Sequence, residues 1–182
     1  MTGADWNVEL ATTADLSATD LQAVRRLMNA AFGDRFSEED WEHATGGTHF
    51  LIRGSKGSVV SHASVVGRRL ESSGAQMSTG YVEAVATEPE FQGRGLATAV
   101  MLRVAEFVQG RFELGALSSG KPAFYERLGW IKWRGATWCR EEGHLARTAD
   151  EDGGVLVLPT RRSPPLDFEG DIAVEWRSGD VW

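Results

Sequence analysis

The sequence contains few cysteines and prolines and lacks any long apolar run. Among its 182 residues are five prolines and a single cysteine, Cys139. A lone cysteine excludes an intramolecular disulfide, which is typical of a chain that folds in a reducing compartment. Nowhere do about 18 apolar residues follow one another, as a membrane-spanning helix requires. Residues 1–10 also lack a basic stretch leading into an apolar run, so no export signal is indicated. We therefore expect a cytoplasmic protein that does not act at a membrane.

The sequence also lacks a surplus of positive charge. Its formal net charge is −7, which argues against binding to a nucleic-acid backbone. The charge is unevenly distributed, since residues 1–45 carry −6, residues 46–140 carry +5 and residues 141–182 carry −6. A basic centre between acidic ends suits a protein that holds a polyanionic cofactor and a cationic second substrate. Taken alone, ordinary solvated surface charge explains such a pattern more often.

Length and periodicity predict one α+β domain over residues 1–182. A hydrophobic fraction of 42% suffices for one sizeable core. Strand-like segments alternate with helix-like ones. Residues 141–182 are loop-rich, and we expect them to form a C-terminal extension with two short strands, over 155–158 and 172–176, rather than a second domain.

The expected elements before that extension follow from periodicity, capping residues and turn residues. Helices are predicted after the capping candidates Ser17 and Thr19, from Ser37 through His43, over 93–109, and from Pro122 to Leu128 with Gly129 ending it. Strands are predicted over residues 8–12, 49–53, 58–70, 77–87, 112–117 and 131–139.

Neither the histidines nor the tryptophans point to a specific site. No pair of histidines has ligand spacing with an acidic or thiol cluster, so no metal site is predicted. Core packing and a homodimer contact explain the seven tryptophans equally well. The histidines are His43, His49, His62 and His144.

A glycine-containing turn precedes the longest predicted helix. Exposed backbone N–H groups and the positive end of the helix dipole make such a turn an anion site suited to a pyrophosphate. A turn that only starts a helix is the structural alternative. A dinucleotide-binding motif is disfavoured, because residues 88–91 separate the turn from its strand and Glu113 begins the next strand instead of ending it. The turn consists of Gln92, Gly93, Arg94, Gly95, Leu96 and Ala97.

This turn resembles the (Arg/Gln)-x-x-Gly-x-(Gly/Ala) signature of the GNAT acetyltransferases. Residues 123–130 (AFYERLGW) resemble the second signature of that fold. Further segments are similar to the aminoglycoside 2'-N-acetyltransferases and keep their order over nearly the whole chain. They are residues 40–43 (DWEH), 46–47 (GG), 80–83 (GYVE), 114–119 (LGALSS) and 176–182 (WRSGDVW).

The resemblance implies an α+β GNAT fold, with a central, largely antiparallel sheet flanked by helices. Its fourth and fifth strands, at residues 77–87 and 112–117, splay apart and leave a wedge for acetyl-CoA. Val85 and Thr87 would pair with the pantetheine arm, and the Val85 N–H would polarise the thioester carbonyl. Residues 92–97 would hold the pyrophosphate. Arg94, Arg103 and Lys121 are either contacts of the adenosine phosphate or solvated surface charges.

Acetyl transfer to an amine requires a base for the amine proton and an acid for the leaving thiolate. Glu83 is expected to alternate with Tyr81 and Val85 on one face of its strand. It is the candidate base, acting through water, because a carboxylate in so apolar a run is costly without a partner; its alternative role is a structural ion pair. By resemblance, Tyr125 is the candidate acid. Its alternative role is packing, although Phe124 and Leu128 are the residues expected to face the core.

The resemblance also implies an acidic pocket for the protonated amines of an aminoglycoside. Two departures from the relatives bear on it. Arg35 follows Asp34 directly, and the stretch from Ser118 to Tyr125 is shorter. The residues assigned to this pocket are Asp34, Asp40, Glu83, Ala84, Ser118, Asp150, Glu151, Asp180 and Trp182, the last through its carboxylate.

The expected function is transfer of an acetyl group from acetyl-CoA to the 2'-amine of an aminoglycoside. Two alternatives remain at this point. One is a GNAT enzyme that acts on another small amine or a peptide. The other is a non-catalytic protein that sequesters a cationic ligand.

Overall fold

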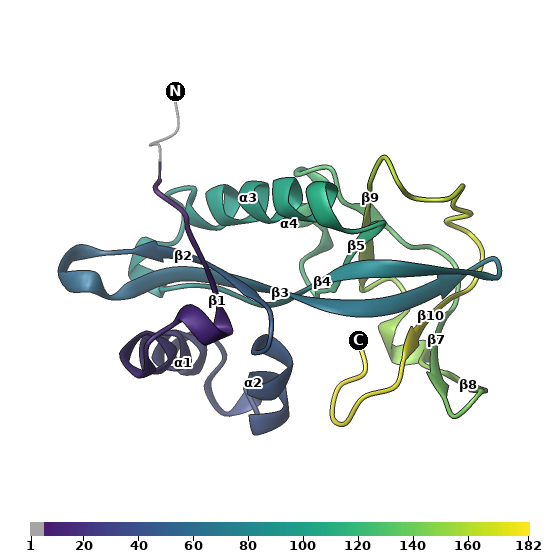
Figure 1. Cartoon of the computed structure of the whole chain (residues 1–182), viewed down its shortest axis with the longest axis horizontal. Coiled ribbons are helices and arrows are strands. Elements are labelled where there is room, and N and C mark those ends of the chain that lie inside the picture. The colour runs from purple at the N-terminus through teal and green to yellow at the C-terminus, as the bar shows by residue number, and fades with distance from the viewer. Residues whose placement is uncertain (1–5) are drawn as a thin grey trace. The chain divides into compact units, whose positions relative to one another are not determined.

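The computed structural model describes residues 6–182, with the side chains of Asp34 and Lys56 outside the described part. The chain divides into two compact units (Figure 1). Unit 1 comprises the described residues up to Val66 together with Val82–Val104, and unit 2 comprises Gly67–Tyr81 and Ala105–Trp182. Three elements continue from one unit into the other, so the single domain over 1–182 stays a prediction. They are β3 (Val59–Ser72), β4 (Ala75–Thr87) and α3 (Leu96–Arg111).

The sheet of unit 1 begins with three antiparallel strands. β1 (Glu9–Thr12) pairs with β2 (Thr48–Arg53), and β2 pairs with β3 through a register shift at Ile52/Arg53. β3 in turn neighbours β4. These strands confirm the prediction to within a few residues at each end.

Two helices cover one face of this sheet, and the first part of α3 covers the other (Figure 1). α1 (Ala18–Phe32) and α2 (Glu38–Ala44) each begin with a capping box, in which Ser17 accepts a hydrogen bond from the Asp20 N–H and Ser37 one from the Asp40 N–H. Of the two capping candidates for the first helix, Ser17 is therefore the N-cap, and the capping pair predicted for Ser37 and Asp40 is confirmed. Short 3-10 turns lie at Thr13–Asp15, Gly33–Arg35, Ser55–Gly57 and Pro89–Phe91.

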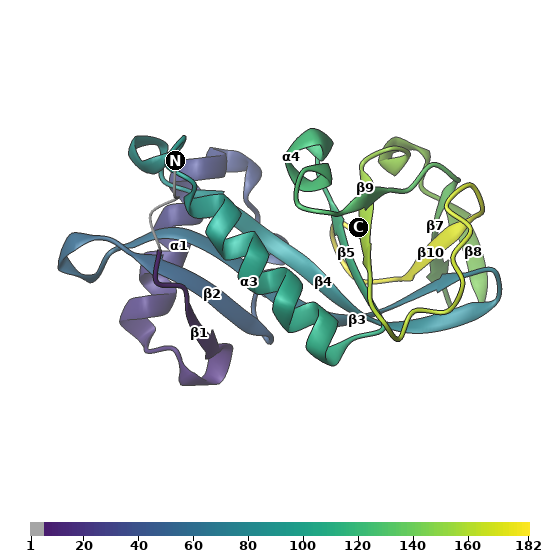
Figure 2. The same cartoon turned by 90° about the horizontal axis from the view of Figure 1, so that it is seen from above.

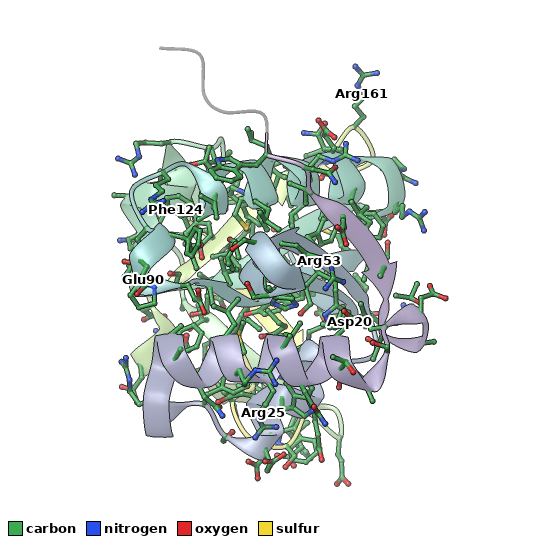
Figure 3. All side chains as sticks on the ribbon, turned by 90° about the vertical axis from the view of Figure 1, so that its left-hand side faces the viewer. Asp20, Arg25, Arg53, Glu90, Phe124 and Arg161 are labelled. Carbon is green, nitrogen blue, oxygen red and sulfur yellow. The ribbon has the colours of Figure 1, made fainter. Side chains whose placement is uncertain are left out.

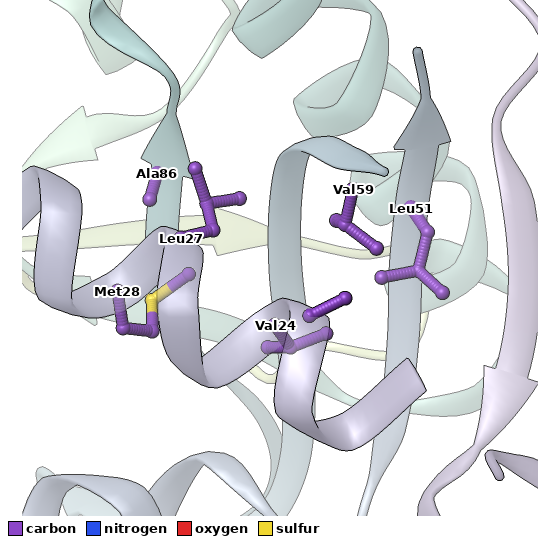
Figure 4. Packing of buried hydrophobic residues seen from close by; sticks show 7 residues of the cluster. Val24, Leu27, Met28, Leu51, Val59 and Ala86 are labelled. Atoms are coloured by element: carbon purple, nitrogen blue, oxygen red, sulfur yellow. The ribbon is translucent and has the colours of Figure 1, made fainter. Parts of the chain in front are cut away.

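The apolar residues of α1 recur at helical spacing, so their side chains lie on one face and pack against the sheet (Figure 4). Leu27 and Met28 are fully buried among side chains of β2, β3 and β4. Burying a side chain of this size contributes roughly 1.5–3 kcal/mol. The cluster consists of Ala23, Val24, Leu27, Met28, Leu51, Val59 and Ala86.

Two arginines fasten α1 to its neighbours. Arg53 of β2 lies beside Asp20 of α1 (Figure 3), and their charged atoms are 2.8 Å apart. Arg25 points from α1 toward α2, where its guanidinium binds Glu38 and lies over the ring of Trp41 at 5.1 Å. The cation–π contact and the ion pair together set the position of α2 within unit 1.

Unit 2 contains the rest of the sheet, in the order β6-β9-β5-β4-β3-β10-β7-β8. Pairing is parallel between β4 and β5 and between β10 and β7, and antiparallel in the other pairs whose register is given. The expected α+β fold with a largely antiparallel sheet is therefore confirmed. Its further strands are β5 (Leu114–Ser118), β6 (Ile131–Lys132), β7 (Thr137–Glu141), β8 (His144–Arg147), β9 (Val155–Pro159) and β10 (Ile172–Glu175).

A short helix, α4 (Pro122–Glu126), lies next to β5 and β9 (Figure 2). Pro122 occupies its first turn, and Gly129 follows it with φ of 89°, as the sequence predicts. Close packing around β5 explains the glycine at position 115. A Cβ there would come within 3.2 Å of the Trp130 ring and 3.0 Å of Val108. A 3-10 turn of this unit lies at Ala149–Glu151.

The single strand predicted over residues 131–139 is wrong, because the structure has two strands there, β6 and β7. The intervening segment leaves β9 and packs against residues 168–170. The Trp133 indole N–H donates to the Gly170 carbonyl at 2.8 Å, and the Phe168 carbonyl accepts hydrogen bonds from two consecutive N–H groups. Gly135 permits this approach, since a Cβ would lie only 1.8 Å from the Gly170 oxygen.

The C-terminal extension contributes strands to the sheet of unit 2. The predicted strands over 155–158 and 172–176 are confirmed as β9, between β6 and β5, and β10, between β3 and β7. β8 was not predicted, because all four of its residues are exposed and it lacks an apolar alternation. Among residues 6–182, no helix is long and apolar enough to cross a membrane.

Candidate active site

The end of β4 and the turn before α3 form the candidate cofactor site of unit 1. Gly93 and Gly95 have φ of 73° and 84°, a region that favours glycine. A Cβ at either position would meet no atom within 4 Å. The glycines are therefore required for the backbone conformation, and space in front of the turn remains for a ligand.

The turn presents the first backbone N–H groups of α3. Ala99 donates to the Gly95 carbonyl at 3.0 Å, so the N–H groups of residues 95–98 precede the first helical hydrogen bond. The Gln92 side chain donates to the Thr87 carbonyl at 3.1 Å and ties the turn to the end of β4. The Arg94 guanidinium is 5.2 Å from the Phe91 ring centroid. The structure thus brings Thr87 together with residues 92–97, in an arrangement able to bind a phosphate group.

β4 is distorted at the residues assigned to catalysis. Ala84 has φ of 50°, which is uncommon for a residue with a side chain. Glu83, Ala84 and Val85 are all half-buried, whereas Tyr81 is buried. The sequence-based expectation that Tyr81, Glu83 and Val85 alternate regularly along one strand face is therefore wrong, because the backbone turns over at Ala84.

Polar side chains of β3 support the distorted part of β4. The Ser64 hydroxyl donates to the Glu83 carbonyl at 3.5 Å, His62 Nδ1 to the Ala84 carbonyl at 2.8 Å, and the Ser61 hydroxyl to the Ala86 carbonyl at 3.2 Å. The Ser61 hydroxyl also lies 2.8 Å from Thr87 Oγ1. Sequence reasoning missed these residues. The signal that could have revealed them is the polar residues Ser61, His62 and Ser64 among the apolar residues of the first half of β3, where residues 59–65 are all buried.

Tyr125, the candidate acid, lies in unit 2 and is buried, with 7% of its surface exposed. Burial raises the pKa of its phenol, and a hydrogen bond with the Ser119 side chain opposes the shift without cancelling it. The phenol is therefore protonated at neutral pH, as an acid must be. The expectation that Phe124 and Leu128 face the core is wrong, since both are only half-buried.

The burial of Tyr125 follows from the shortness of α4. The helix ends after one turn, and the Trp130 N–H bonds back to the Tyr125 carbonyl at 3.2 Å. The Trp130 ring then lies edge-on to the tyrosine ring at 6.4 Å. Helical spacing over seven residues does not apply to so short an element, which is why the predicted orientation failed.

Unit 2 contains an open pocket of ≈ 460 Å³. Three of the predicted substrate carboxylates, those of Asp150, Glu151 and Asp180, line it. Arg147 also lines it, but it donates to Asp152, and these hydrogen bonds lower the pKa of Asp152 to about 2. The remaining carboxylates give the pocket a negative character. The lining residues are Arg147, Thr148, Ala149, Asp150, Glu151, Gly179, Asp180 and Val181.

Two further predicted residues join this pocket. Ser118 donates to Glu151 at 2.7 Å. Trp182 is buried, its indole N–H donates to Thr148 Oγ1 at 2.9 Å, and its main-chain N–H donates to Asp180 at 3.1 Å. The structure therefore brings together five of the predicted substrate-binding residues.

The three remaining acids, Asp34, Asp40 and Glu83, belong to unit 1. Asp40 is part of the capping box of α2, where its carboxylate accepts a hydrogen bond from the Ser37 N–H at 2.9 Å. This gives it a structural role whatever else it binds. The side chain of Asp34 lies outside the described residues. The adjacent Arg35 directs its Nε to the Phe32 carbonyl at 3.4 Å.

Two arginines hold the C-terminal segment, and sequence reasoning missed both. Arg68 is 6% exposed and donates to the Val181 carbonyl at 2.6 Å and to the Glu175 carbonyl at 2.7 Å. Arg177 donates to the carbonyls of Asp180 and Trp182. Both guanidiniums lie over the ring of Tyr81, at 4.9 Å and 5.6 Å. No sequence pattern distinguishes Arg68 from its exposed neighbour Arg69.

A strand that leads through a glycine turn into an anion-binding helix, within a largely antiparallel sheet, is the architecture of the GNAT acetyltransferases. A family model described as an acetyltransferase (GNAT) domain matches residues 13–132. Solved structures agree on the fold. A GNAT family N-acetyltransferase (YhbS) from Escherichia coli in complex with CoA is 13% identical, with a TM-score of 0.66 and coverage of 97% of this chain and 93% of that one. A GNAT family acetyltransferase from Brucella melitensis in complex with acetyl-CoA is 15% identical, with a TM-score of 0.62 and coverage of 94% and 97%.

A curated relative points to one family within the GNAT acetyltransferases. The aminoglycoside 2'-N-acetyltransferase of Mycolicibacterium fortuitum is 41% identical over 177 residues, which cover 95% of this chain and 90% of the relative. The chain therefore belongs to the GNAT acetyltransferases and, within them, to the family of the aminoglycoside 2'-N-acetyltransferases. Both the fold and the family expected from the sequence are confirmed.

Proposed function

We propose that this protein transfers an acetyl group from acetyl-CoA to the 2'-amine of aminoglycosides. The observation that carries the proposal is the acidic pocket of unit 2 in a chain of this family. Several carboxylates close together attract a polycation and lower the cost of removing it from water. Asp150, Glu151 and Asp180 supply those charges, and Ser118 and Thr148 supply hydroxyl groups beside them.

Acetyl-CoA fits the residues of unit 1 chemically. The N–H groups at the start of α3 suit a pyrophosphate, and the glycines leave the space that phosphate oxygens require. Arg94 adds a positive charge at the same turn. The strand segment from Val85 to Thr87 offers backbone groups to the amide-containing pantetheine arm. Acetyl-CoA supplies the activated acetyl group, and the roles below belong to the protein.

Three groups divide the chemistry. Glu83 removes a proton from the attacking ammonium group through water, which leaves the amine neutral and nucleophilic. The Val85 N–H stabilises the negative charge that develops on the carbonyl oxygen during attack. As the C–S bond breaks, Tyr125 donates its phenolic proton to the departing thiolate, since the raised pKa keeps the phenol protonated. The proton that the nitrogen loses on becoming an amide restores the phenol.

The same proposal includes a cytoplasmic location and action without a nucleic acid or a membrane. The single, buried Cys139 and the net charge of −7 support it. A homodimer stays a prediction. Trp130 and Trp133, two of the tryptophans that suggested it, are buried within unit 2.

The decisive experiment measures free thiol released from acetyl-CoA by the purified chain with a panel of aminoglycosides. The panel pairs compounds that carry a 2'-amine with compounds that lack it. We expect thiol release and a singly acetylated product only with the former. Acetylation regardless of the 2'-amine would indicate a different amine as the substrate, and tight binding without thiol release would indicate a binding protein.

The pocket itself is tested by Asp150→Asn, which removes one exposed carboxylate from its lining. Each lost charge weakens attraction of a polycation, so we expect a higher KM for the aminoglycoside and an unchanged KM for acetyl-CoA. Asp171→Asn is the matched control, because Asp171 is also exposed and lies in unit 2 outside this lining. Equal effects of the two substitutions would contradict the assignment of the pocket.

A further inference from the structure

A buried chain of hydrogen bonds ends at the distorted residue of β4. Thr13 Oγ1 lies 2.8 Å from His49 Nε2, His49 Nδ1 lies 2.9 Å from His62 Nε2, and His62 Nδ1 lies 2.8 Å from the Ala84 carbonyl oxygen. Neither histidine has any exposed surface. All four residues belong to unit 1.

The direction of every hydrogen bond in this chain follows from its last member. A carbonyl oxygen only accepts, so His62 Nδ1 carries a proton and its Nε2 accepts one from His49 Nδ1. His49 Nε2 must then accept from the hydroxyl of Thr13, which itself accepts from the Gly46 N–H at 2.8 Å. Both rings are neutral in this arrangement. Burial lowers the pKa of His49 to about 4 and that of His62 to about 3, which agrees with it.

The chain cannot deliver a proton to a reaction, because it ends on a main-chain carbonyl. Its effect is on backbone geometry. Ala84 at φ of 50° is strained by its own side chain, and such a conformation persists only where the surroundings hold it. The hydrogen bond from His62 is a contact that holds it.

The Ala84 carbonyl and the Val85 N–H belong to the same peptide plane. No described peptide bond is cis. In a trans peptide the C=O and N–H point in opposite directions. Because His62 on β3 holds the carbonyl, it also aims the Val85 N–H away from β3.

We infer that His62, held in place by His49, is a positioning residue for acetyl transfer that fixes the Ala84–Val85 peptide so that the Val85 N–H meets the developing oxyanion. The inference rests on the proposed function, in which that N–H stabilises the charge. It adds two histidines and Thr13 to the residues on which turnover depends. None of them touches a reacting atom.

Three variants test the inference. His62→Phe keeps the ring and removes the donor. His62→Asn restores a donor at the same number of bonds from Cβ as Nδ1. Val59→Ala, also in β3, is the matched control, because it removes buried volume from the core of unit 1 and leaves every donor and acceptor of the hydrogen-bond chain in place. Each variant is assayed for kcat and KM on an amine that the wild type accepts, and for CoA affinity by calorimetry.

We expect His62→Phe to lower kcat by about tenfold or more, since outright loss of an oxyanion donor costs roughly 10²–10³-fold. Its affinity for CoA should stay within about twofold of wild type, because CoA has no acetyl carbonyl to polarise. Its KM for acetyl-CoA should change as little, because the N–H acts on charge that develops only in the transition state. His62→Asn should recover most of the lost kcat. In NMR spectra, the Ala84 carbonyl and Val85 amide resonances should shift in His62→Phe and hardly in Val59→Ala.

A folded His62→Phe with wild-type kcat overturns the inference. So does an equal loss of kcat and CoA binding in His62→Phe and His62→Asn, which would indicate a merely structural histidine. If His62→Phe does not fold, His49→Leu replaces it, and an unchanged kcat there is equally contrary. Failure of the proposed function looks different, because the wild type itself would then acetylate an amine other than the 2'-amine.

Discussion

At the scale of single residues, Ala84 links the structure of β4 to its chemistry. A positive φ within a strand would be easiest for glycine, yet an alanine occupies the position. Three side chains of β3 donate hydrogen bonds to β4 carbonyls in this region, those of Glu83, Ala84 and Ala86. The strained position lies between Glu83 and Val85, the two residues to which the proposal assigns proton removal and charge stabilisation.

Glu83→Gln tests the proposed base. The amide keeps the shape of the side chain but cannot accept the amine proton, so we expect kcat to fall by about 10²–10⁴-fold. CoA affinity measured by calorimetry should not change. Glu88→Gln, at a half-buried position just beyond the end of β4, is the control. A folded Glu83→Gln enzyme with full activity would remove Glu83 from the mechanism.

Tyr125 and Ser119 together test the proposed acid. Tyr125→Phe preserves the buried ring, so the protein should fold while kcat falls substantially. Ser119→Ala removes the hydrogen bond that lowers the phenol pKa, and the pKa should therefore rise further. We expect the alkaline limb of the kcat profile to move to higher pH in Ser119→Ala. A limb that does not move would show that another group limits turnover there.

Among the elements, β4 differs between its two ends in which groups bind its backbone. Residues Thr79–Tyr81 pair in parallel with Leu114–Ala116 of β5, and the described register covers only these three pairs. From Glu83 onward, side chains of β3 contact the carbonyls of β4. A strand of regular apolar alternation was the natural prediction from the sequence, because alternation does not report which backbone groups lack a strand partner.

The C-terminal segment is the second element whose position matters. Residues 179–181 line the acidic pocket, and Arg68 holds the segment through the carbonyls of Val181 and Glu175. Burial lowers the pKa of Arg68, but an arginine remains protonated in proteins. Its planar fork can reach both carbonyls at once, which a lysine cannot do.

Arg68→Lys should therefore loosen the pocket wall without affecting the cofactor residues of unit 1. A lost hydrogen bond to a charged group is worth about 1.5–3 kcal/mol, so we expect roughly a tenfold or greater rise in the KM for the aminoglycoside. The KM for acetyl-CoA should stay constant. Arg69→Lys provides the control at an adjacent exposed position. A rise in both KM values would indicate general unfolding instead.

For the molecule as a whole, the buried pair His49–His62 makes the free energy of unfolding depend on pH. The unfolded chain protonates its histidines near pH 6.5, whereas the folded chain resists protonation until about pH 4 for His49 and about pH 3 for His62. Between pH 6.5 and pH 4 the unfolded state consequently binds more protons. The free energy of unfolding should fall as the pH falls through this window.

Urea unfolding at several pH values measures this dependence. Each histidine contributes a slope of up to about 1.4 kcal/mol per pH unit within the window. His62→Phe should flatten the slope, and His144→Gln should not, since His144 is exposed. A wild-type stability that is constant from pH 6.5 to pH 4 would contradict the assignment of two neutral, buried rings.

Local sequence patterns were sufficient to predict the family, most of the elements and a glycine turn suited to an anion. Ser17 and Ser37 located the helix starts, and the glycines of residues 92–97 indicated an anion site, because caps and turns depend on neighbouring residues alone. The burial of Tyr125 and the two strands within residues 131–139 could be seen only in the fold. The same is true of the contacts by which Arg68 holds the C-terminal segment and His62, beside His49, holds the Ala84 carbonyl. These features arise from contacts between residues far apart in the chain, and local periodicity contains no information about such contacts.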